Sequence, residues 1–252
     1  MSKLIACYGP QGVGTTSFSI ALAKHLTGYK NPDTKKPYSV ALIFASNLNP
    51  PLPYLQPSFI VERSSSQKTK SLGNIFGLTK PSQYDILKQA EVIPSNKNLL
   101  LFGYAYGQSR DTYSKPIEAD FLAFFYELSQ FIDYIVVDCD SNPRDYLTNF
   151  AINSADYFIQ TCGCDYKSIC FFASNMSRLS FNKDVVKTSV YPNVKSYESP
   201  YDIKGLHGGF YTVKNDESVS NLYYSGKYLD SPIQSVYKPA LIKLCKEVLY
   251  LM

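Results

Sequence analysis

A short apolar stretch that runs directly into a glycine-rich loop is the feature that most constrains the fold of this chain. Residues Lys3–Tyr8 are mostly apolar and predict a buried strand, and the loop Gly-Pro-Gln-Gly-Val-Gly-Thr-Thr follows at residues 9–16. From Thr16 to Gly28 apolar residues recur at spacings of three and four, which is typical of an amphipathic helix with a glycine stop. A glycine loop between a strand and a helix is the context in which this pattern binds phosphate.

The loop has the glycines of a phosphate site without its positive charge. Glycines at positions 9, 12 and 14 let backbone N–H groups turn toward an anion, and the helix N-terminus adds partial positive charge. Thr16 stands where a hydroxyl would bind Mg²⁺, whereas Thr15 stands where the phosphate-loop consensus has a lysine. These residues favour nucleotide binding, and the alternative is a strand-to-helix turn whose glycines serve only tight packing.

Strands and helices alternate along the rest of the chain, which predicts an α/β fold: a doubly wound, mainly parallel sheet with helices on both faces, as in P-loop NTPases. No linker or internal repeat is visible, so residues 1–252 predict a single P-loop NTPase-like domain. Aromatic and polar residues alternate around glycines at 195–224 and predict a β-hairpin excursion. Further strands are expected at 39–44, 98–102, 134–137, 155–161 and 185–194, and helices at 81–90, 117–132, 165–179 and from Pro239 to the end.

The composition excludes several classes of protein. Hydrophobic residues make up 45% and charged residues 18% of the chain, which is too apolar for a disordered protein. No apolar run approaches the roughly 18 residues that span a bilayer, and no signal-peptide pattern opens the chain, so a cytoplasmic location is expected. The formal net charge of +4 permits a nucleic-acid partner without indicating one. The six cysteines lack the spacing of a zinc site.

Two carboxylates stand where a predicted strand ends. Asp138 and Asp140 flank Cys139 directly after residues 134–137. This is the edge of an open α/β sheet at which ligands bind, so Asp138 is a candidate to contact Mg²⁺ or a water molecule. The alternative is a strand-end carboxylate that caps a turn, and it applies even more to Asp140.

With these residues in view, the chain resembles the ParA/MinD class of P-loop ATPases. The loop of that class has the pattern K-G-G-x-G-K-[ST], in register with residues 10–16, but Pro10 and Thr15 replace its two lysines. The first of these lysines reaches the partner's phosphates across a nucleotide-sandwich dimer, which Pro10 cannot do. After the second strand the class has D-x-D, where this chain has Ala45, Ser46 and Asn47.

Later segments extend the resemblance in the same order along the chain. Residues 134–143 are similar to the Walker B strand with its D-x-x-P ending, and Asp138 is kept. Residues 155–161 resemble the A-D-x-x-I-x-V-T run, and residues 221–229 resemble the A-x-x-x-G-K segment. Residues 45–49 and 98–103 look most like the TadZ/CpaE branch, which localises pilus-assembly and secretion machinery and often has atypical phosphate loops.

The resemblance implies ATP and Mg²⁺ as ligands, a homodimer, and protein partners in a pilus, secretion or partition machine. The residues that it assigns to nucleotide binding are Gly9, Pro10, Gln11, Gly12, Val13, Gly14, Thr15, Thr16 and Asp138, of which Thr16 and Asp138 would contact Mg²⁺.

Hydrolysis needs positive charge against the transferring phosphoryl group, so the lost lysines predict very slow turnover. Lys68, Lys70 or Lys80 could substitute from the segment after the second strand, although a solvated loop is the usual fate of such lysines. The expected function is a nucleotide-binding scaffold or localisation factor. An active ParA/MinD-type ATPase and an interaction protein that binds no nucleotide stay open as alternatives.

The last predicted helix carries an apolar stripe. Its members share one helical face and are Leu241, Leu244, Cys245, Val248 and Met252. Such a stripe packs on the sheet more often than it binds a membrane, so burial is predicted and membrane association is not.

Overall fold

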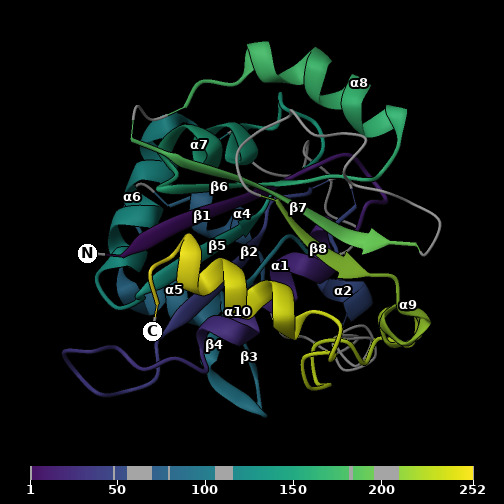
Figure 1. The fold of residues 1–252 in the computed structure, drawn as a ribbon. Coiled ribbons are helices and arrows are strands. Elements are labelled where there is room, and N and C mark those ends of the chain that lie inside the picture. The colour runs from purple at the N-terminus through teal and green to yellow at the C-terminus, as the bar shows by residue number, and fades with distance from the viewer. Residues whose placement is uncertain are drawn as a thin grey trace.

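The structure, a computed structural model, describes residues 2–47, 49–55, 70–78, 80–105, 116–181, 184–195 and 210–251. Its centre is an eight-stranded sheet in the order β3-β4-β2-β5-β1-β6-β7-β8 (Figure 1). Every neighbouring pair is parallel except β3 and β4, which are antiparallel. The predicted mainly parallel α/β sheet is confirmed.

The strands are β1 (Lys3–Tyr8), β2 (Val40–Phe44), β3 (Glu91–Ile93), β4 (Asn96–Phe102), β5 (Tyr134–Asp138), β6 (Tyr157–Thr161), β7 (Val186–Val194) and β8 (Phe210–Lys214). The helices are α1 (Thr15–Leu26), α2 (Leu52–Leu55), α4 (Leu72–Phe76), α5 (Gln83–Gln89), α6 (Glu118–Ser129), α7 (Tyr146–Ser154), α8 (Tyr166–Asn175), the 3₁₀ helix η2 (Met176–Arg178), α9 (Glu217–Tyr224) and α10 (Lys238–Glu247).

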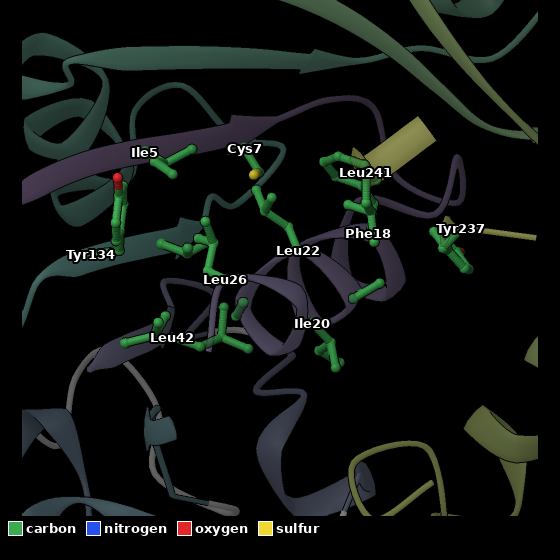
Figure 2. Packing of buried hydrophobic residues seen from close by; sticks show 14 of the residues in the cluster. Ile5, Cys7, Phe18, Ile20, Leu22, Leu26, Leu42, Tyr134, Tyr237 and Leu241 are labelled. Atoms are coloured by element: carbon green, nitrogen blue, oxygen red, sulfur yellow. The ribbon is translucent and has the colours of Figure 1, made fainter. Parts of the chain in front are cut away.

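Helices cover both faces of the sheet, as the alternation predicts. Buried residues of α1 and α10 form one core cluster with one face of the strands, and buried residues of α4 to α8 form a second cluster on the other face. Figure 2 shows Leu22 pointing from α1 toward Cys7 of β1, with Leu241 of α10 in the same cluster. Strand β1, which leads into the glycine loop, therefore lies between two packed layers.

The described members of the stripe on α10 are buried, as predicted, whereas Met252 lies outside the described residues. Leu241, Leu244 and Cys245 have no exposed surface, and Val248 is 7% exposed. Pro239 stands in the first turn of the helix, where its missing N–H costs no hydrogen bond. Among the residues described, no helix combines the length and apolar character needed to cross a bilayer.

The described part of residues 195–224 is not a β-hairpin. Strand β8 joins the sheet in parallel with β7, with Val190 opposite Tyr211, and α9 follows it. Residues 196–209, on which the rest of the predicted excursion falls, lie outside the described residues. The alternation of aromatic and polar residues here belongs to an edge strand that continues the main sheet.

Candidate functional site

The loop after β1 has the backbone geometry that its glycines predict. Gly12 and Gly14 lie in the left-handed region, with φ of 88° and 96°, where a side chain is strained. Gly14 is the N-cap of α1, and no side chain caps this helix end. The partial positive charge at the start of α1 is therefore available to an anion.

Gly9 is required by a close approach of two strands. A Cβ atom at this position would collide with Oγ1 and with the carbonyl oxygen of Thr161, at the end of β6. Because one of the colliding atoms belongs to the backbone, a change of rotamer could not relieve the contact. The absence of a side chain at Gly9 thus allows the start of the loop to pass close to the end of β6.

Thr15, at the position of the consensus lysine, has its hydroxyl engaged within the protein. Its Oγ1 lies 2.7 Å from Oγ1 of Thr161, which is fully buried. The pair forms a neutral hydrogen bond between the start of α1 and the end of β6. Thr15 accordingly brings no positive charge to the loop.

Asp138, the last residue of β5, accepts hydrogen bonds from two hydroxyls of α1. Thr16 Oγ1 donates to Oδ2 over 2.8 Å, and Ser19 Oγ donates to Oδ1 over 3.1 Å. Burial raises the pKa of Asp138 from 3.8 to about 7, while the two hydroxyl hydrogen bonds act in the opposite direction. A carboxylate and a hydroxyl are oxygen donors of the kind that Mg²⁺ prefers, and a divalent cation beside Asp138 would favour its ionised form.

Asp140 takes part in the turn that follows β5. Its Oδ1 accepts a hydrogen bond from the N–H of Asn142 over 2.7 Å, and its own N–H donates to Thr148 Oγ1 over 2.8 Å. These contacts match the turn-forming alternative, although the residue also borders the cavity described next.

A cavity of about 580 Å³ opens over the loop. The loop side of its lining comprises Gly9, Pro10, Gln11, Gly12, Gly14, Thr15, Thr16, Ser17 and residues 138–142. A second part, called here the tyrosine wall, comprises Lys214, Asp216, Val219, Ser220, Tyr223, Tyr224 and Tyr237. All the predicted site residues except Val13, whose side chain is buried, lie in this lining.

The end of β2 brings neutral polar groups to the cavity. Ala45 is fully buried, whereas Ser46 and Asn49 line the cavity. At the two positions where the resemblance places carboxylates, this chain has the methyl group of Ala45 and the amide of Asn47.

Two lysines that the sequence analysis did not single out lie beside the loop or the cavity. Lys167 Nζ, from the first turn of α8, donates to the carbonyl oxygen of Gln11 over 3.3 Å. Lys214, at the end of β8, lines the cavity. Lys70, a predicted substitute, instead donates to Glu91 Oε2 over 3.2 Å and to the carbonyl oxygen of Ala90 over 2.8 Å, so it holds the start of β3.

Of the other two predicted substitutes, Lys68 lies outside the described residues and Lys80 is exposed and not part of the cavity lining. Among the residues missed, only Ser19 had a local signal, because it lies one helical turn after Thr16. Thr161, Lys167 and Lys214 reach the loop or the cavity through the strand order β1-β6-β7-β8, which no short motif encodes.

No family model matches the chain, and a search of curated proteins finds no match. Solved structures that resemble it over nearly its whole length include the following three. A ParA family ATPase from Chlorobium tepidum has a TM-score of 0.69 at 13% identity, covering 98% of this chain and 99% of its own. MinD from Pyrococcus horikoshii, solved with Mg-ADP, has a TM-score of 0.66 at 14% identity, covering 98% and 96%.

A putative plasmid partition protein from Borrelia burgdorferi, solved with AMPPNP, has a TM-score of 0.57 at 18% identity, covering 97% of this chain and 98% of its own. At such identities the likeness establishes the fold. The chain therefore has the fold of the ParA/MinD class of P-loop ATPases.

Proposed function

We propose that this chain binds a nucleoside triphosphate with Mg²⁺ in the cavity and works as a scaffold or localisation factor, with slow hydrolysis or none. The observation that carries the proposal is the uncapped start of α1 behind two left-handed glycines, beside the hydrogen-bonded pair of Thr16 and Asp138. A helix N-terminus preceded by glycines is an anion site that needs no charged side chain.

The residues present fit the two ligands. Backbone N–H groups of the loop would hold the phosphates, and the Thr16 hydroxyl and Asp138 carboxylate would hold the cation. When bound, Mg²⁺ neutralises phosphate charge. The structures solved with Mg-ADP and with AMPPNP are instances of such ligands in proteins of this fold.

Slow hydrolysis follows from groups that the chain lacks on the loop side. Positions 10 and 15 carry no lysine, the Thr15 hydroxyl is bonded to Thr161, and Ala45 stands where a carboxylate is expected. Loss of a single group that stabilises the transition state costs about 10²–10³ in rate. Binding depends on backbone N–H groups instead, so it can persist when turnover is lost.

A narrower role rests on the resemblance of residues 45–49 and 98–103 to the TadZ/CpaE branch. We place the chain with factors that position a pilus-assembly, secretion or partition machine from the cytoplasm, acting as a homodimer. An active ATPase of the ParA/MinD type is the second candidate, favoured by the intact Thr16 and Asp138 pair.

Calorimetric titration with Mg-ATP, together with a phosphate-release assay, separates these functions. The scaffold predicts saturable, Mg²⁺-dependent binding with little phosphate release, and an active ATPase predicts release with turnover. Thr16→Ala should remove the Mg²⁺ dependence, whereas Thr212→Ala, on the exposed side of β8, should not. Absence of binding at millimolar nucleotide, with no thermal shift, would leave only an interaction protein that holds no nucleotide.

Thr15→Lys provides a second test. The restored lysine should tighten nucleotide binding but leave hydrolysis slow, because Ala45 and Asn47 still lack carboxylates. Rapid turnover in this single variant would mean that the second-strand carboxylates are not needed.

A further inference from the structure

The loop side of the cavity has no positively charged side chain among the described residues, but Lys167 donates a hydrogen bond to the loop. Among the residues that the structure describes, the cavity lining includes a single cationic side chain, Lys214, and that residue belongs to the tyrosine wall. Lys167 is not part of the lining but donates its hydrogen bond to the loop itself, at the carbonyl oxygen of Gln11.

Lys167 reaches the loop from the opposite face of the sheet to α1. Helix α8 packs in the core cluster of the second face, whereas α1 packs in the first. Asp165 caps α8 by accepting from the N–H of Ser168 over 2.8 Å, and this fixes the first turn, in which Lys167 stands. The order β1-β6 brings the start of α8 to the same sheet edge as the glycine loop.

The ammonium group of Lys167 has donors to spare. It can donate three hydrogen bonds, and the carbonyl of Gln11 accepts one of them. Within the described part of the chain, no carboxylate forms an ion pair with it: the ion pairs found there involve Lys3 and Lys70. The side chain is exposed, so its four-carbon stem can turn a few ångströms without displacing core residues.

We propose that Lys167 supplies in cis the positive charge that Thr15 does not, by contacting the β- and γ-phosphates of a nucleotide held in the loop. In phosphate loops that keep the consensus lysine, that lysine reaches these two phosphates. Here the cation comes from α8 instead, and Gln11 marks the part of the loop over which it lies. This role rests on the proposed nucleotide binding.

Lys167 rather than Lys214 fits this role because of what each one touches. Lys167 contacts the backbone between Gly9 and Gly12, whereas Lys214 lies at the end of β8 with no hydrogen bond to the loop among the described residues. A purely structural role is the competing explanation, in which the Lys167 ammonium only holds the loop by its bond to Gln11.

The test measures the affinity of each variant for a non-hydrolysable ATP analogue and for ADP, both with Mg²⁺. The variants are Lys167→Gln and Lys167→Arg. The matched control is Lys88→Gln, on the exposed face of α5. Lys167→Gln should weaken the triphosphate analogue by about ten-fold and ADP by less, Lys167→Arg should retain most of the affinity, and Lys88→Gln should change neither.

A double-variant cycle excludes the structural explanation. In the Thr15→Lys background a lysine stands at the consensus position, so Lys167→Gln should have little further effect on affinity. If Lys167→Gln lowers the melting temperature and the affinity equally in both backgrounds, Lys167 only holds the loop and the proposal is wrong. The proposal is also wrong if Lys167→Gln leaves the affinity unchanged, or if only Lys214→Gln lowers it. Either result would leave the proposed nucleotide binding intact.

Inorganic tripolyphosphate distinguishes failure of this proposal from failure of nucleotide binding. If the wild type binds tripolyphosphate through Lys167 but no nucleotide, Lys167 still contacts phosphate at the loop, whereas the proposed nucleotide binding is wrong. If the wild type binds neither probe, both fall.

Discussion

The loop side of the cavity and the tyrosine wall are built in different ways. The loop side is made mainly of backbone: two left-handed glycines, an uncapped helix start, and Gly9 pressed against Thr161. The tyrosine wall is made of side chains from the end of β8, from α9 and its N-cap Asp216, and from the residue before α10. Backbone geometry tolerates almost no substitution at a few positions, whereas a side-chain surface can vary at many.

The two parts are joined through α1. Lys24 Nζ donates to the carbonyl oxygens of Tyr228 and Ser231, over 2.9 and 2.6 Å, and the Tyr228 hydroxyl donates to the carbonyl oxygen of Ser17 over 3.1 Å. The segment between α9 and α10 is therefore tied to the helix that the glycine loop opens. Changes on one side should reach the other through these bonds.

The largest effect is expected at Gly9. In Gly9→Ala the new methyl group would collide with backbone and side-chain atoms of Thr161, so β1 and β6 would have to separate locally. We expect a loss of about 3 kcal/mol or more in the free energy of unfolding, at or beyond the usual range for overpacking. Urea unfolding measures this loss.

Gly77→Ala is the matched control, because a Cβ atom there would meet nothing closer than 3.6 Å. It should change the free energy of unfolding by less than about 0.5 kcal/mol. If Gly9→Ala were as mild as this control, the loop side would be as tolerant as the tyrosine wall, and the contrast between them would fail.

Lys24→Met tests the link between the two parts. Methionine fills similar space but leaves the carbonyl oxygens of Tyr228 and Ser231 without their donor, at a cost of about 2 kcal/mol in the free energy of unfolding. Lys97→Met, at an exposed position of β4, should be nearly neutral. Hydrogen exchange should quicken between α9 and α10 in the first variant only, and unchanged exchange there would mean that the bonds do not hold the segment.

The sequence predicted the loop side well because its constraints are local. A buried strand, glycines at fixed spacing and a helical repeat determine one turn, and the structure has β1, Gly12, Gly14 and α1 where the pattern predicts them. Asp138 could also be identified from the sequence as a candidate, because a carboxylate at the end of a buried strand falls at the edge of a parallel sheet where ligands bind.

The tyrosine wall was not predicted, because nothing local brings its parts together. β8 was taken for part of a hairpin, although its neighbour in the sheet is β7 in parallel, and a parallel pair is set by the connection between the strands rather than by a turn. Helix α7 was missed as well. Its start is set by Asp145, which accepts from the N–H of Thr148, but polar residues interrupt the apolar repeat that follows.

Asp138→Asn should raise stability at the expense of binding. The folded protein keeps the proton of Asp138 up to a pH of about 7, whereas the unfolded chain releases it near the ordinary pKa of 3.8. The stability that this proton contributes is complete below pH 4 and is lost as the pH rises through 7. At pH 8 the wild type has lost this contribution, so the uncharged variant should be more stable than the wild type by a few kcal/mol.

Urea unfolding at pH 5 and pH 8 measures this difference in stability, which should be smaller at pH 5 because Asp138 of the folded wild type is still protonated there. The same variant should lose the Mg²⁺ dependence of nucleotide binding. Asp140→Asn is the control, because the Asp140 carboxylate accepts a hydrogen bond from the N–H of Asn142 in the turn and is only partly buried. If the wild type were instead more stable than Asp138→Asn at pH 8, groups within the fold would already stabilise the charge of Asp138. The stability of the loop side would then not require a bound cation.

The smallest effect is expected from Tyr228→Phe, which removes one hydroxyl from the link and leaves the ring in place. Its bond to the Ser17 carbonyl is lost, but that carbonyl lies in the first turns of α1, where the helix supplies a further donor, so the cost should be about 1 kcal/mol. The informative measurement is the affinity for Mg-ATP. The Tyr228 hydroxyl interacts both with Ser17 of the loop side and with the hydroxyl of Tyr237 in the tyrosine wall. If the two parts act as one binding surface, the variant should weaken binding more than the exposed control Tyr84→Phe, and equal affinities would mean that the wall and the loop side bind independently.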